Sequence, residues 1–434
     1  MYQLKYSNGV VDIPVDEKNV VAVLESNPIE KTLSPEACVK AALDHPIGGQ
    51  SIAQAIQPTD RVCIIVSDVT RLWQSPFVFI PILVDRLNAA GIKDDQIVIL
   101  FSLGTHRQQT EAEKKQIVGE EIYKRIKTVD HNCDDSEHLE FYGETSRGTP
   151  VYLNSLLSQC DKIILTGAAI YHLLAGFGGG GKSILPGVAS RKTIYAHHNL
   201  GLNPEVGTGS NPEASPGRLA TNPFHLDIVE AAAMAKPAYL LNVVVNKDHD
   251  IINAFAGDWR SAHDQAAEFV RQVDGIPIKQ QVPLVIASAE GFPKDINLYQ
   301  SSKTLTNGNA ATQEGGTLIM LTSCREGFGS PETQHFLCDF DTITETEEAL
   351  RKAFSIGGYV GFDYKEIAGR KNLILVSEID KTLLEGTGIH AVSSIEEALE
   401  VAKKLNGGTL DVETLLMPQG GTTFPIVDAD ASTR

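Results

Sequence analysis

Uninterrupted apolar runs of strand length alternate with longer amphipathic segments, and this alternation constrains the fold more than any other feature of the sequence. The runs lack the polar alternation of a half-exposed strand, so each is typical of a strand buried on both faces of a sheet. Two intervening segments, 75–91 and 222–236, have helical spacing of apolar residues, with a Ser or an Asn at the start as a candidate cap. The runs are RVCIIVSD (61–68), QIVILFSLG (96–104), DKIILTG (161–167) and AYLLNVVVN (238–246). This order predicts an α/β fold with a largely parallel sheet and crossover helices.

A second alternating set follows, and a chain of 434 residues is too long for one hydrophobic core. The segment 258–275 is predicted to be a helix that ends at Gly275, with IPIK after it as a linker. We therefore expect an N-terminal α/β domain over 1–275 and a C-terminal α/β domain over 276–434. The second set comprises QVPLVIAS (281–288), GGTLIMLTS (315–323), TETEEALRKAFS (344–355), NLILVSEI (372–379) and SIEEALEVAKKLN (394–406).

The composition of the chain excludes several classes of binding partner and of cellular location. A net charge of −18 argues against a surface for nucleic acid or anionic membrane. The six cysteines are widely scattered without a CxxC pair, which indicates reduced thiols in a cytoplasmic protein. The start of the sequence lacks a basic and then apolar signal pattern, and no apolar run approaches 18 residues. We expect neither secretion nor membrane insertion.

Unusual polar residues cluster just after the predicted strands. Loops at these ends of an open α/β sheet converge on a crevice, where such sheets bind their ligands. The clusters are SDVTR (67–71), LGTHR (103–107), YHLLAGFGGGGKSILPG (171–187) with HHN (197–199), and GFPKDINLYQSSK (291–303). Catalytic or ligand-binding residues are therefore expected in these four clusters.

The glycine run has two interpretations. Gly176 to Ser183 matches G-x-x-x-x-G-K-[ST], the phosphate-binding pattern of P-loop NTPases. Pro186 and Gly187 follow at once and would break the helix that a P-loop lysine must open. The segment AAIYHLLAGF also separates the run from the preceding strand, where a P-loop turns almost directly into the phosphate site. An NTPase is kept as an alternative, but these two features count against it.

Taken together and in this order, the four clusters resemble the lactate racemase family, from about Arg61 to Lys303. His172 precedes Lys182 by ten residues, and His198 follows that lysine by sixteen. The resemblance implies two α/β domains with an active-site cleft between them. It also implies nickel in a nickel-pincer nucleotide, a pyridinium-3-thioamide-5-thiocarboxylic acid mononucleotide joined covalently to Lys182. The enzymes of cofactor biosynthesis are then expected partners.

The resemblance also assigns roles around the cofactor. His198 takes the position of the nickel ligand, and a neutral imidazole suits nickel. His197 is the competing neighbour, for which a packing role is expected. The loop lacks the Ser and Arg of lactate-specific members, which are replaced by Gly178 and Gly181. Phosphate binding is therefore expected from backbone N–H groups and a hydroxyl, supplied by Gly179, Gly180 and Ser183.

The resemblance assigns the substrate contacts as well. Arg71 would grip the substrate carboxylate, since a guanidinium binds a carboxylate in bidentate fashion. Asp68 would support the cofactor or Arg71, unless it caps the helix predicted to begin near Ser75. Gln300 and Lys303, with Tyr299 beside them, would reach substrate and cofactor from one helix face, the alternative being a solvated face.

The chemistry of a 2-hydroxy acid favours removal of its Cα hydrogen as hydride. Inverting a 2-hydroxy acid by removing the Cα hydrogen as a proton would place two negative charges side by side, whereas removing it as hydride avoids this. The hydroxyl loses its proton as hydride leaves, so each of two mirror-related orientations needs a base near neutral pKa. His106 and His172 match the two catalytic histidines of the family. The expected function is racemisation or epimerisation at C2 of a lactate-like 2-hydroxy acid.

The side chain of the substrate is not fixed by these residues. The segment 356–365 lacks the tryptophan that lactate-specific members carry against the substrate, so lactate, malate, a longer or aromatic 2-hydroxy acid and a sugar acid are all candidates. A protein that carries the cofactor without catalysis is a second alternative, although it has no use for two histidines and an arginine. The sequence determines neither the physiological direction, nor the oligomeric state, nor cofactor occupancy.

Overall fold

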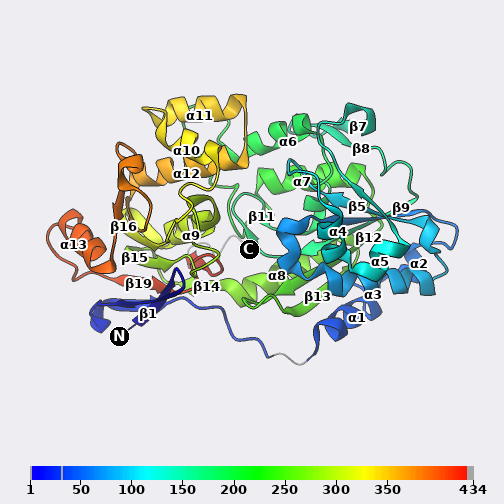
Figure 1. Cartoon of the computed structure of the whole chain (residues 1–434), viewed down its shortest axis with the longest axis horizontal. Helices are drawn as coiled ribbons and strands as arrows, with labels where there is room; N and C mark the ends of the chain where they lie inside the picture. The colour runs from blue at the N-terminus through cyan, green and yellow to red at the C-terminus, as the bar shows by residue number, and fades with distance from the viewer. Residues whose placement is uncertain (1, 31–32, 428–434) are drawn as a thin grey trace. The chain divides into compact units, whose positions relative to one another are not determined.

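The computed structural model describes residues 2–30 and 33–427, and it divides the chain into two units, each built on a six-stranded sheet (Figure 1). The unit that contains Lys182 spans Ile29–Gly201 and Pro212–Val270, and we call it the lysine unit. The other, which we call the terminal unit, comprises Met1–Pro28, Leu202–Asn211 and Arg271–Arg434.

The sheet of the lysine unit has the strand order β13-β12-β9-β4-β5-β6. All its neighbouring strands are parallel except β13, which pairs antiparallel with β12 at one edge. Residues 62–66 of β4 are all buried, as expected for a strand covered on both faces. The strands are β4 (Val62–Ser67), β5 (Ile97–Ser102), β6 (Lys127–Asp130), β9 (Lys162–Ala168), β12 (Tyr239–Val245) and β13 (Ile251–Gly257). The predicted α/β fold is confirmed here.

Helices and short hairpins complete the lysine unit. Asn222 caps α7 as expected, because its Oδ1 accepts from the N–H groups of Phe224 and His225. Ser75 does not cap α3: it adopts φ 57°, and its hydroxyl donates to the carbonyl oxygen of His249. The helices are α1 (Pro35–Asp44), α2 (Ile52–Ala55), α3 (Pro76–Ala89), α4 (Glu111–Val118), α5 (Glu120–Arg125), α6 (Arg191–His198), α7 (Pro223–Met234) and α8 (Trp259–Asp274). The hairpins are β7 (Leu139–Glu144) with β8 (Pro150–Asn154), and β10 (Tyr171–His172) with β11 (Gly176–Phe177).

The sheet of the terminal unit has the order β18-β17-β16-β15-β19-β3, and all its pairs are parallel. The strands are β3 (Val20–Val23), β15 (Val282–Ser288), β16 (Thr312–Leu321), β17 (Asn372–Val376), β18 (Ile389–Val392) and β19 (Thr414–Met417). The helices are α9 (Leu298–Ala311), α10 (Pro331–Cys338), α11 (Ile343–Lys352), α12 (Ile356–Arg370) and α13 (Ile395–Leu405). Two further pairs are β1 (Tyr2–Tyr6) with β2 (Gly9–Ile13), and β14 (Gly275–Ile278) with β20 (Phe424–Val427).

The observed division differs from the expected one, which assigned 1–275 to a single domain. Residues 1–28 belong to the terminal unit, because β3 hydrogen-bonds to β19 and so adds an edge strand to the second sheet. The chain crosses between units within α8, after Val270. The segment expected to be a linker, IPIK, instead contributes to β14, which pairs in parallel with β20.

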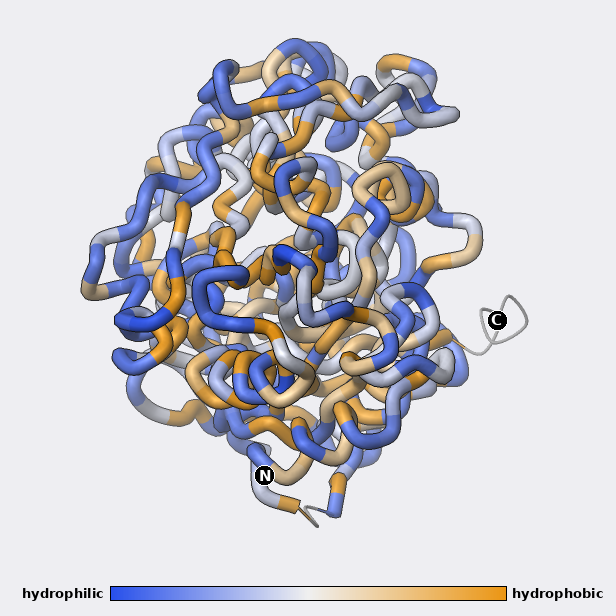
Figure 2. The backbone as a smooth tube through the Cα atoms, turned by 90° about the vertical axis from the view of Figure 1, so that its right-hand side faces the viewer, coloured by the Kyte–Doolittle hydropathy of each residue, from blue (hydrophilic) through white to orange (hydrophobic). Residues whose placement is uncertain are grey.

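The hydropathy of the residues alternates along the chain. Figure 2 shows hydrophobic stretches, in orange, alternating along the chain with hydrophilic ones, in blue. Within the described residues, the structure contains no helix with the length and apolar character that crossing a membrane requires.

Candidate functional site

The glycine run places Lys182 by bringing the backbone against two polar side chains. A Cβ atom on Gly179 would lie 2.4 Å from Oδ1 of Asn242, and one on Gly180 would lie 2.7 Å from the ring of His263. Both glycines also have positive φ, at 79° and 56°. Only glycine fits this path, which leads into a short 3-10 helix over Gly180–Ser183 that carries the lysine.

The conformation and hydrogen bonds of this loop differ from those of a phosphate-binding P-loop. The helical segment after the glycines is four residues long, so it offers no helix dipole to a phosphate. The N–H of Gly180 donates to Asn242 Oδ1 at 2.9 Å, and the hydroxyl of Ser183 donates to the carbonyl oxygen of Thr166 at 2.9 Å. Two donors that the sequence assigned to a phosphate are therefore hydrogen-bonded within the protein in this structure.

The Lys182 side chain is half-buried, and no acidic group of the described chain lies within ion-pair distance of its amine. Burial, together with the positive charge of Arg71, lowers the pKa of Lys182 to about 7. A large fraction of the amine is therefore neutral at physiological pH, and a neutral amine is the nucleophilic form.

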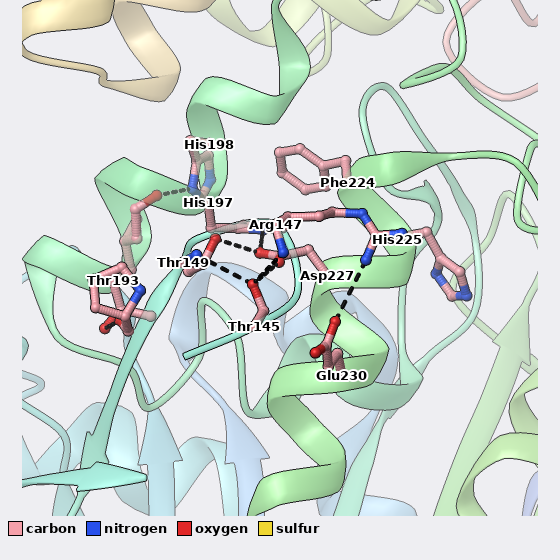
Figure 3. Close-up of polar contacts among 12 residues, drawn as sticks. Thr145, Arg147, Thr149, Thr193, His197, His198, Phe224, His225, Asp227 and Glu230 are labelled. Atoms are coloured by element: carbon pink, nitrogen blue, oxygen red, sulfur yellow. Dashed lines mark hydrogen bonds and ion pairs between the residues drawn. The ribbon is translucent and has the colours of Figure 1, made fainter. Parts of the chain in front are cut away.

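Helix α6 ends in two adjacent imidazoles, His197 and His198 (Figure 3). His198 is buried, and its Nδ1–H donates to the carbonyl oxygen of Ile194 at 2.7 Å. Its Nε2 atom therefore carries a lone pair. Burial lowers the pKa of His198 well below its usual value, and the charges of His197 and Lys182 add to this. A neutral imidazole fixed through its other nitrogen is the form in which histidine binds a metal.

His197 is held in a buried polar network that the sequence did not predict. Its Nδ1–H donates to Oδ2 of Asp227 at 2.8 Å, and Asp227 also accepts from the hydroxyls of Thr145 at 2.5 Å and Thr149 at 2.8 Å (Figure 3). Burial opposes ionisation, but these donors hold the pKa of Asp227 below its usual value. Within the described chain, Nε2 of His197 is buried without a hydrogen-bond partner. The network thus leaves a second lone pair in the interior.

Two further histidines of this region, His225 and His263, were not predicted from the sequence. His263 hydrogen-bonds through Nε2 to the carbonyl oxygen of Gly178 at 3.0 Å, and its ring stacks on His225 at 5.9 Å between centroids. Burial lowers the pKa of both, that of His225 to about 3, and the charge of Lys182 adds to the effect. Asn242, His225 and Asp227 each interrupt an apolar stretch of the sequence. That interruption was the one signal that could have identified them.

A second carboxylate and histidine pair lies after β4 and β5. Nδ1 of His106 is 2.5 Å from Oδ2 of Asp68, and the other oxygen of Asp68 accepts from Thr70. Burial opposes ionisation of Asp68, but the hydrogen bonds from His106 and Thr70 and the charges of His106 and Arg71 lower its pKa. Asp68 caps the 3-10 helix over Val69–Gln74 rather than α3. The exposed guanidinium of Arg71 follows on that turn.

His172 lies on the short hairpin that leads into the glycine run, opposite Gly176. Its Nδ1 atom accepts hydrogen bonds from the backbone N–H groups of Leu174 at 3.2 Å and Ala175 at 3.1 Å. The side chain is half-buried. The turn between β10 and β11 therefore fixes the ring through its Nδ1 edge.

The three residues expected from the second domain lie on α9 of the terminal unit. Asn297 caps this helix by accepting from the N–H of Gln300 at 2.9 Å. Gln300 and Lys303 are exposed and Tyr299 is half-buried against the core of the unit. The helix predicted for this motif is thus present.

The chemistry of the donors limits what the lysine unit could hold. Among the described residues, no three His, Cys, Asp or Glu side chains converge as a complete metal-binding group. The neutral imidazole of His198, a reactive amine at Lys182 and the unpaired Nε2 of His197 fit a metal that arrives with most of its own ligands. They fit a metal-carrying organic group better than a bare ion.

Comparisons with known proteins find similarity to lactate racemases along almost the whole chain. Residues 6–209 match the model of the lactate racemase N-terminal domain, and residues 278–423 match that of the lactate racemase C-terminal domain. The sequence is 31% identical to a lactate racemase of Lactiplantibacillus plantarum, covering 95% of this chain and 97% of the relative. It is 33% identical to that of Thermoanaerobacterium thermosaccharolyticum, covering 82% and 81%.

Two solved structures are also similar. The lactate racemase apoprotein from Thermoanaerobacterium thermosaccharolyticum superposes with a TM-score of 0.88 at 28% identity, covering 98% of this chain and 99% of that one. A protein from Thermotoga maritima superposes with a TM-score of 0.63 at 17% identity, covering 93% and 100%, which is a likeness of fold.

Proposed function

Because the chain belongs to the lactate racemase family, we propose that it inverts C2 of a lactate-like 2-hydroxy acid with a nickel-pincer nucleotide attached to Lys182. The observation that carries this proposal is the state of that lysine. A half-buried amine with a pKa of about 7 and no acidic partner among the described residues is suited to forming an amide-type bond. A merely structural lysine would instead be paired or solvated.

His198 is the proposed nickel ligand. Its Nδ1–H donates to a backbone carbonyl, which orients Nε2 as a donor. His197 is buried beside it with the two rings 5.2 Å apart, and it is the competing candidate. The cofactor would supply a hydride acceptor for the Cα hydrogen of the substrate.

The remaining residues handle the substrate. Arg71 would bind the carboxylate, and its exposed guanidinium is available to do so. His106, paired with Asp68, would exchange the proton of the hydroxyl, and His172 would serve the hydroxyl in the second orientation. Tyr299, Gln300 and Lys303 are proposed substrate and cofactor contacts on the basis of their motif. A carrier without catalysis would have no need of the pair between Asp68 and His106.

The attachment is tested by producing the protein together with the enzymes of cofactor biosynthesis and measuring intact mass and nickel content. The wild type should be heavier than its sequence by one nucleotide adduct, and Lys182→Ala should carry none. His198→Ala should lose nickel while His197→Ala keeps it, and the reverse would transfer the ligand role to His197. An unmodified lysine in a preparation that racemises its substrate would overturn the proposal.

The substrate and reaction are tested with a panel of 2-hydroxy acids deuterated at Cα. Lactate, malate, longer and aromatic 2-hydroxy acids and a sugar acid differ only in the side chain. The product should retain most of the deuterium if the hydrogen moves as hydride. Complete exchange with solvent would instead indicate proton abstraction and would contradict the proposed reaction.

A further inference from the structure

Asp295 is a fully buried carboxylate in the loop that leads into α9, and it joins three segments of the terminal unit. Its Oδ2 atom accepts hydrogen bonds from the backbone N–H groups of Ser7, at 2.6 Å, and Ser323, at 3.3 Å. Its own carbonyl oxygen accepts from the N–H of Cys324 at 2.8 Å and from the hydroxyl of Ser323 at 3.0 Å. The turn between β1 and β2 and the loop after β16 are therefore both fixed to this residue.

The turn of the amino-terminal hairpin also packs against the start of the same loop. The carbonyl oxygen of Ser7 accepts from the N–H of Phe292 at 2.8 Å. A Cβ atom on Gly291 would lie 2.7 Å from that oxygen, and Gly291 has a φ of 72°, so a side chain does not fit there. The hydroxyl of Ser288, at the end of β15, donates to the carbonyl oxygen of Lys5. The hairpin thus supports the first half of the loop.

Beyond Asp295, the loop is hydrogen-bonded to the loop after β16 as far as the first turn of α9. Leu298 is the first residue of this helix and follows Asp295 closely in the chain. The place of Asp295 therefore determines where α9 begins, and with it where the helix holds Gln300 and Lys303. The hydrogen bonds run from the N–H groups of Glu326, Leu298 and Tyr299 to the carbonyl oxygens of Ile296, Gly327 and Phe328, at 2.9, 3.0 and 3.1 Å.

This junction is assembled at an energetic cost. Of the six non-glycine residues with positive φ in the described chain, three, Ser7, Glu290 and Cys324, lie at it. Among the described residues, Oδ1 of Asp295 is buried without a hydrogen-bond partner. Both features destabilise a fold, and such features concentrate where function requires a fixed geometry.

We propose that Asp295 is a positioning residue for the reaction, which fixes the start of α9 and thereby places Gln300 and Lys303 for substrate and cofactor. This inference rests on the proposed function and adds a residue to it. Because its side chain is fully buried, Asp295 acts through the helix rather than by contact with the substrate. A carboxylate suits this role because one of its oxygens can accept from two N–H groups at once.

The first test follows the start of α9 in the apoprotein and needs no cofactor. Amide hydrogen exchange read by mass spectrometry compares the peptide over 296–303 in wild type, Asp295→Asn and Asp295→Leu. The two substituted side chains have similar shapes, but only Asn keeps an oxygen that can accept both N–H groups. Leu should accelerate exchange in this peptide by about tenfold or more, because the local structure opens more often, while Asn stays near wild type. Unchanged exchange in the Leu variant, or equal acceleration over α13, would overturn the proposal.

Two further variants keep this test decisive. Gly291→Ala leaves the carboxylate in place but forces the turn at Ser7 away from the loop, and it should also accelerate exchange over 296–303. Should Asp295→Leu fail to fold, wild-type exchange in Gly291→Ala would contradict the proposal. Ser394→Ala is the control: it removes the cap of α13, which packs on the other face of the sheet, and should leave this peptide unchanged.

The second test uses the loaded enzyme, with kcat/KM expressed per folded, nickel-containing molecule. Asp295→Leu should lose about 10–10²-fold, since a displacement of contact groups by about 1 Å is sufficient for such a loss. Asp295→Asn and Ser394→Ala should stay within about threefold of wild type. A purely structural carboxylate would lower only the unfolding temperature of the Leu variant, and that result would overturn the proposal. If wild-type holoprotein interconverts no 2-hydroxy acid, the proposed function fails, and the exchange experiment still decides whether Asp295 fixes the start of α9.

Discussion

The lysine unit contains two aspartate and histidine pairs of the same construction, Asp68 with His106 and Asp227 with His197. In both, Nδ1 of the ring faces a carboxylate, at 2.5 Å and 2.8 Å. They differ in burial: the His106 side chain is 44% exposed, whereas His197 and Asp227 are both 0% exposed. The same chemistry is thus placed once at the surface and once in the interior.

Exposure to solvent and substrate determines what such an aspartate and histidine pair can do. A half-exposed imidazole can exchange protons with a substrate, as a general base must. A fully buried pair is out of contact with solvent, and the hydrogen bonds of Asp227 with Thr145 and Thr149 instead help to fix the end of α6 beside His198. Lys182 interacts electrostatically with the buried pair, because its charge lowers the pKa of His197, and Arg71 in turn lowers the pKa of Lys182.

The largest expected effect is on catalysis at the exposed pair. His106→Ala in loaded enzyme should reduce kcat by about 10²–10⁴-fold, since the group that takes the hydroxyl proton is lost. His138→Ala is the matched control, because His138 pairs with Asp135 at 2.9 Å on the surface. Steady-state kinetics on both variants gives the comparison. Equal reductions of kcat in the two variants would mean that the pair of Asp68 and His106 has no specific role in catalysis.

The second effect is on stability at the buried pair. Asp227→Ala should lower the free energy of unfolding of the apoprotein by about 3–5 kcal/mol, because it leaves buried partners without their acceptor. Glu230→Ala, one turn further along α7, removes a partly exposed pair with Arg147 and should cost at most about 1 kcal/mol. Urea denaturation measures both. A small loss in Asp227→Ala would show that the buried pair is not a structural element.

A smaller effect distinguishes the two carboxylates by pH. Both aspartates have a folded-state pKa below the unfolded value of about 3.9, so their stabilisation is complete above that value and is lost as pH falls through the folded pKa. The stability advantage of wild type over Asp227→Asn should therefore shrink between about pH 5 and pH 2. Asp68→Asn should show a shallower trend, because its partner is partly solvated. Parallel curves for wild type and Asp227→Asn would contradict this.

The smallest effect concerns the pKa of Lys182. Removing the positive charge in Arg71→Ala should raise the pKa of Lys182, so that its labelling by an amine-reactive reagent at pH 7 slows by roughly twofold to fivefold. Peptide mass spectrometry follows the labelling of that residue. Arg107→Ala is the control, since its guanidinium pairs with Glu113. Identical labelling of Lys182 in both variants would remove Arg71 as a cause.

The sequence predicted the long elements well, for a physical reason. β4, β5, β9 and β12 lie within a residue or two of the predicted runs, since strands buried on both faces must be continuously apolar. Strand β3 was missed because it has four residues, and its partner β19 begins at Thr414, almost the whole chain away. Pairing over such a separation leaves no local signal.

Motifs in the sequence identified candidate site residues, whereas the buried contacts around them could not be predicted from the sequence. Clustering after strand ends pointed to Asp68, His106 and Lys182. Asp227 and Asn242 lie inside a helix and a strand, and what they contact became visible only in three dimensions. The engaged donors of the glycine run were likewise invisible, because a sequence does not show which N–H is already used.

The placement of β3 has a consequence for biosynthesis. The strand that pairs with β3 is made about 390 residues later in the chain, after the whole lysine unit. During that interval the amino-terminal segment has no sheet to join, and the lysine unit can fold first. A fragment limited to the carboxyl-terminal segment would expose the unpaired edge of β19, a template for intermolecular strand addition. Production of the terminal unit by itself therefore requires β3 to be supplied in trans or by circular permutation, and the unit also includes Leu202–Asn211.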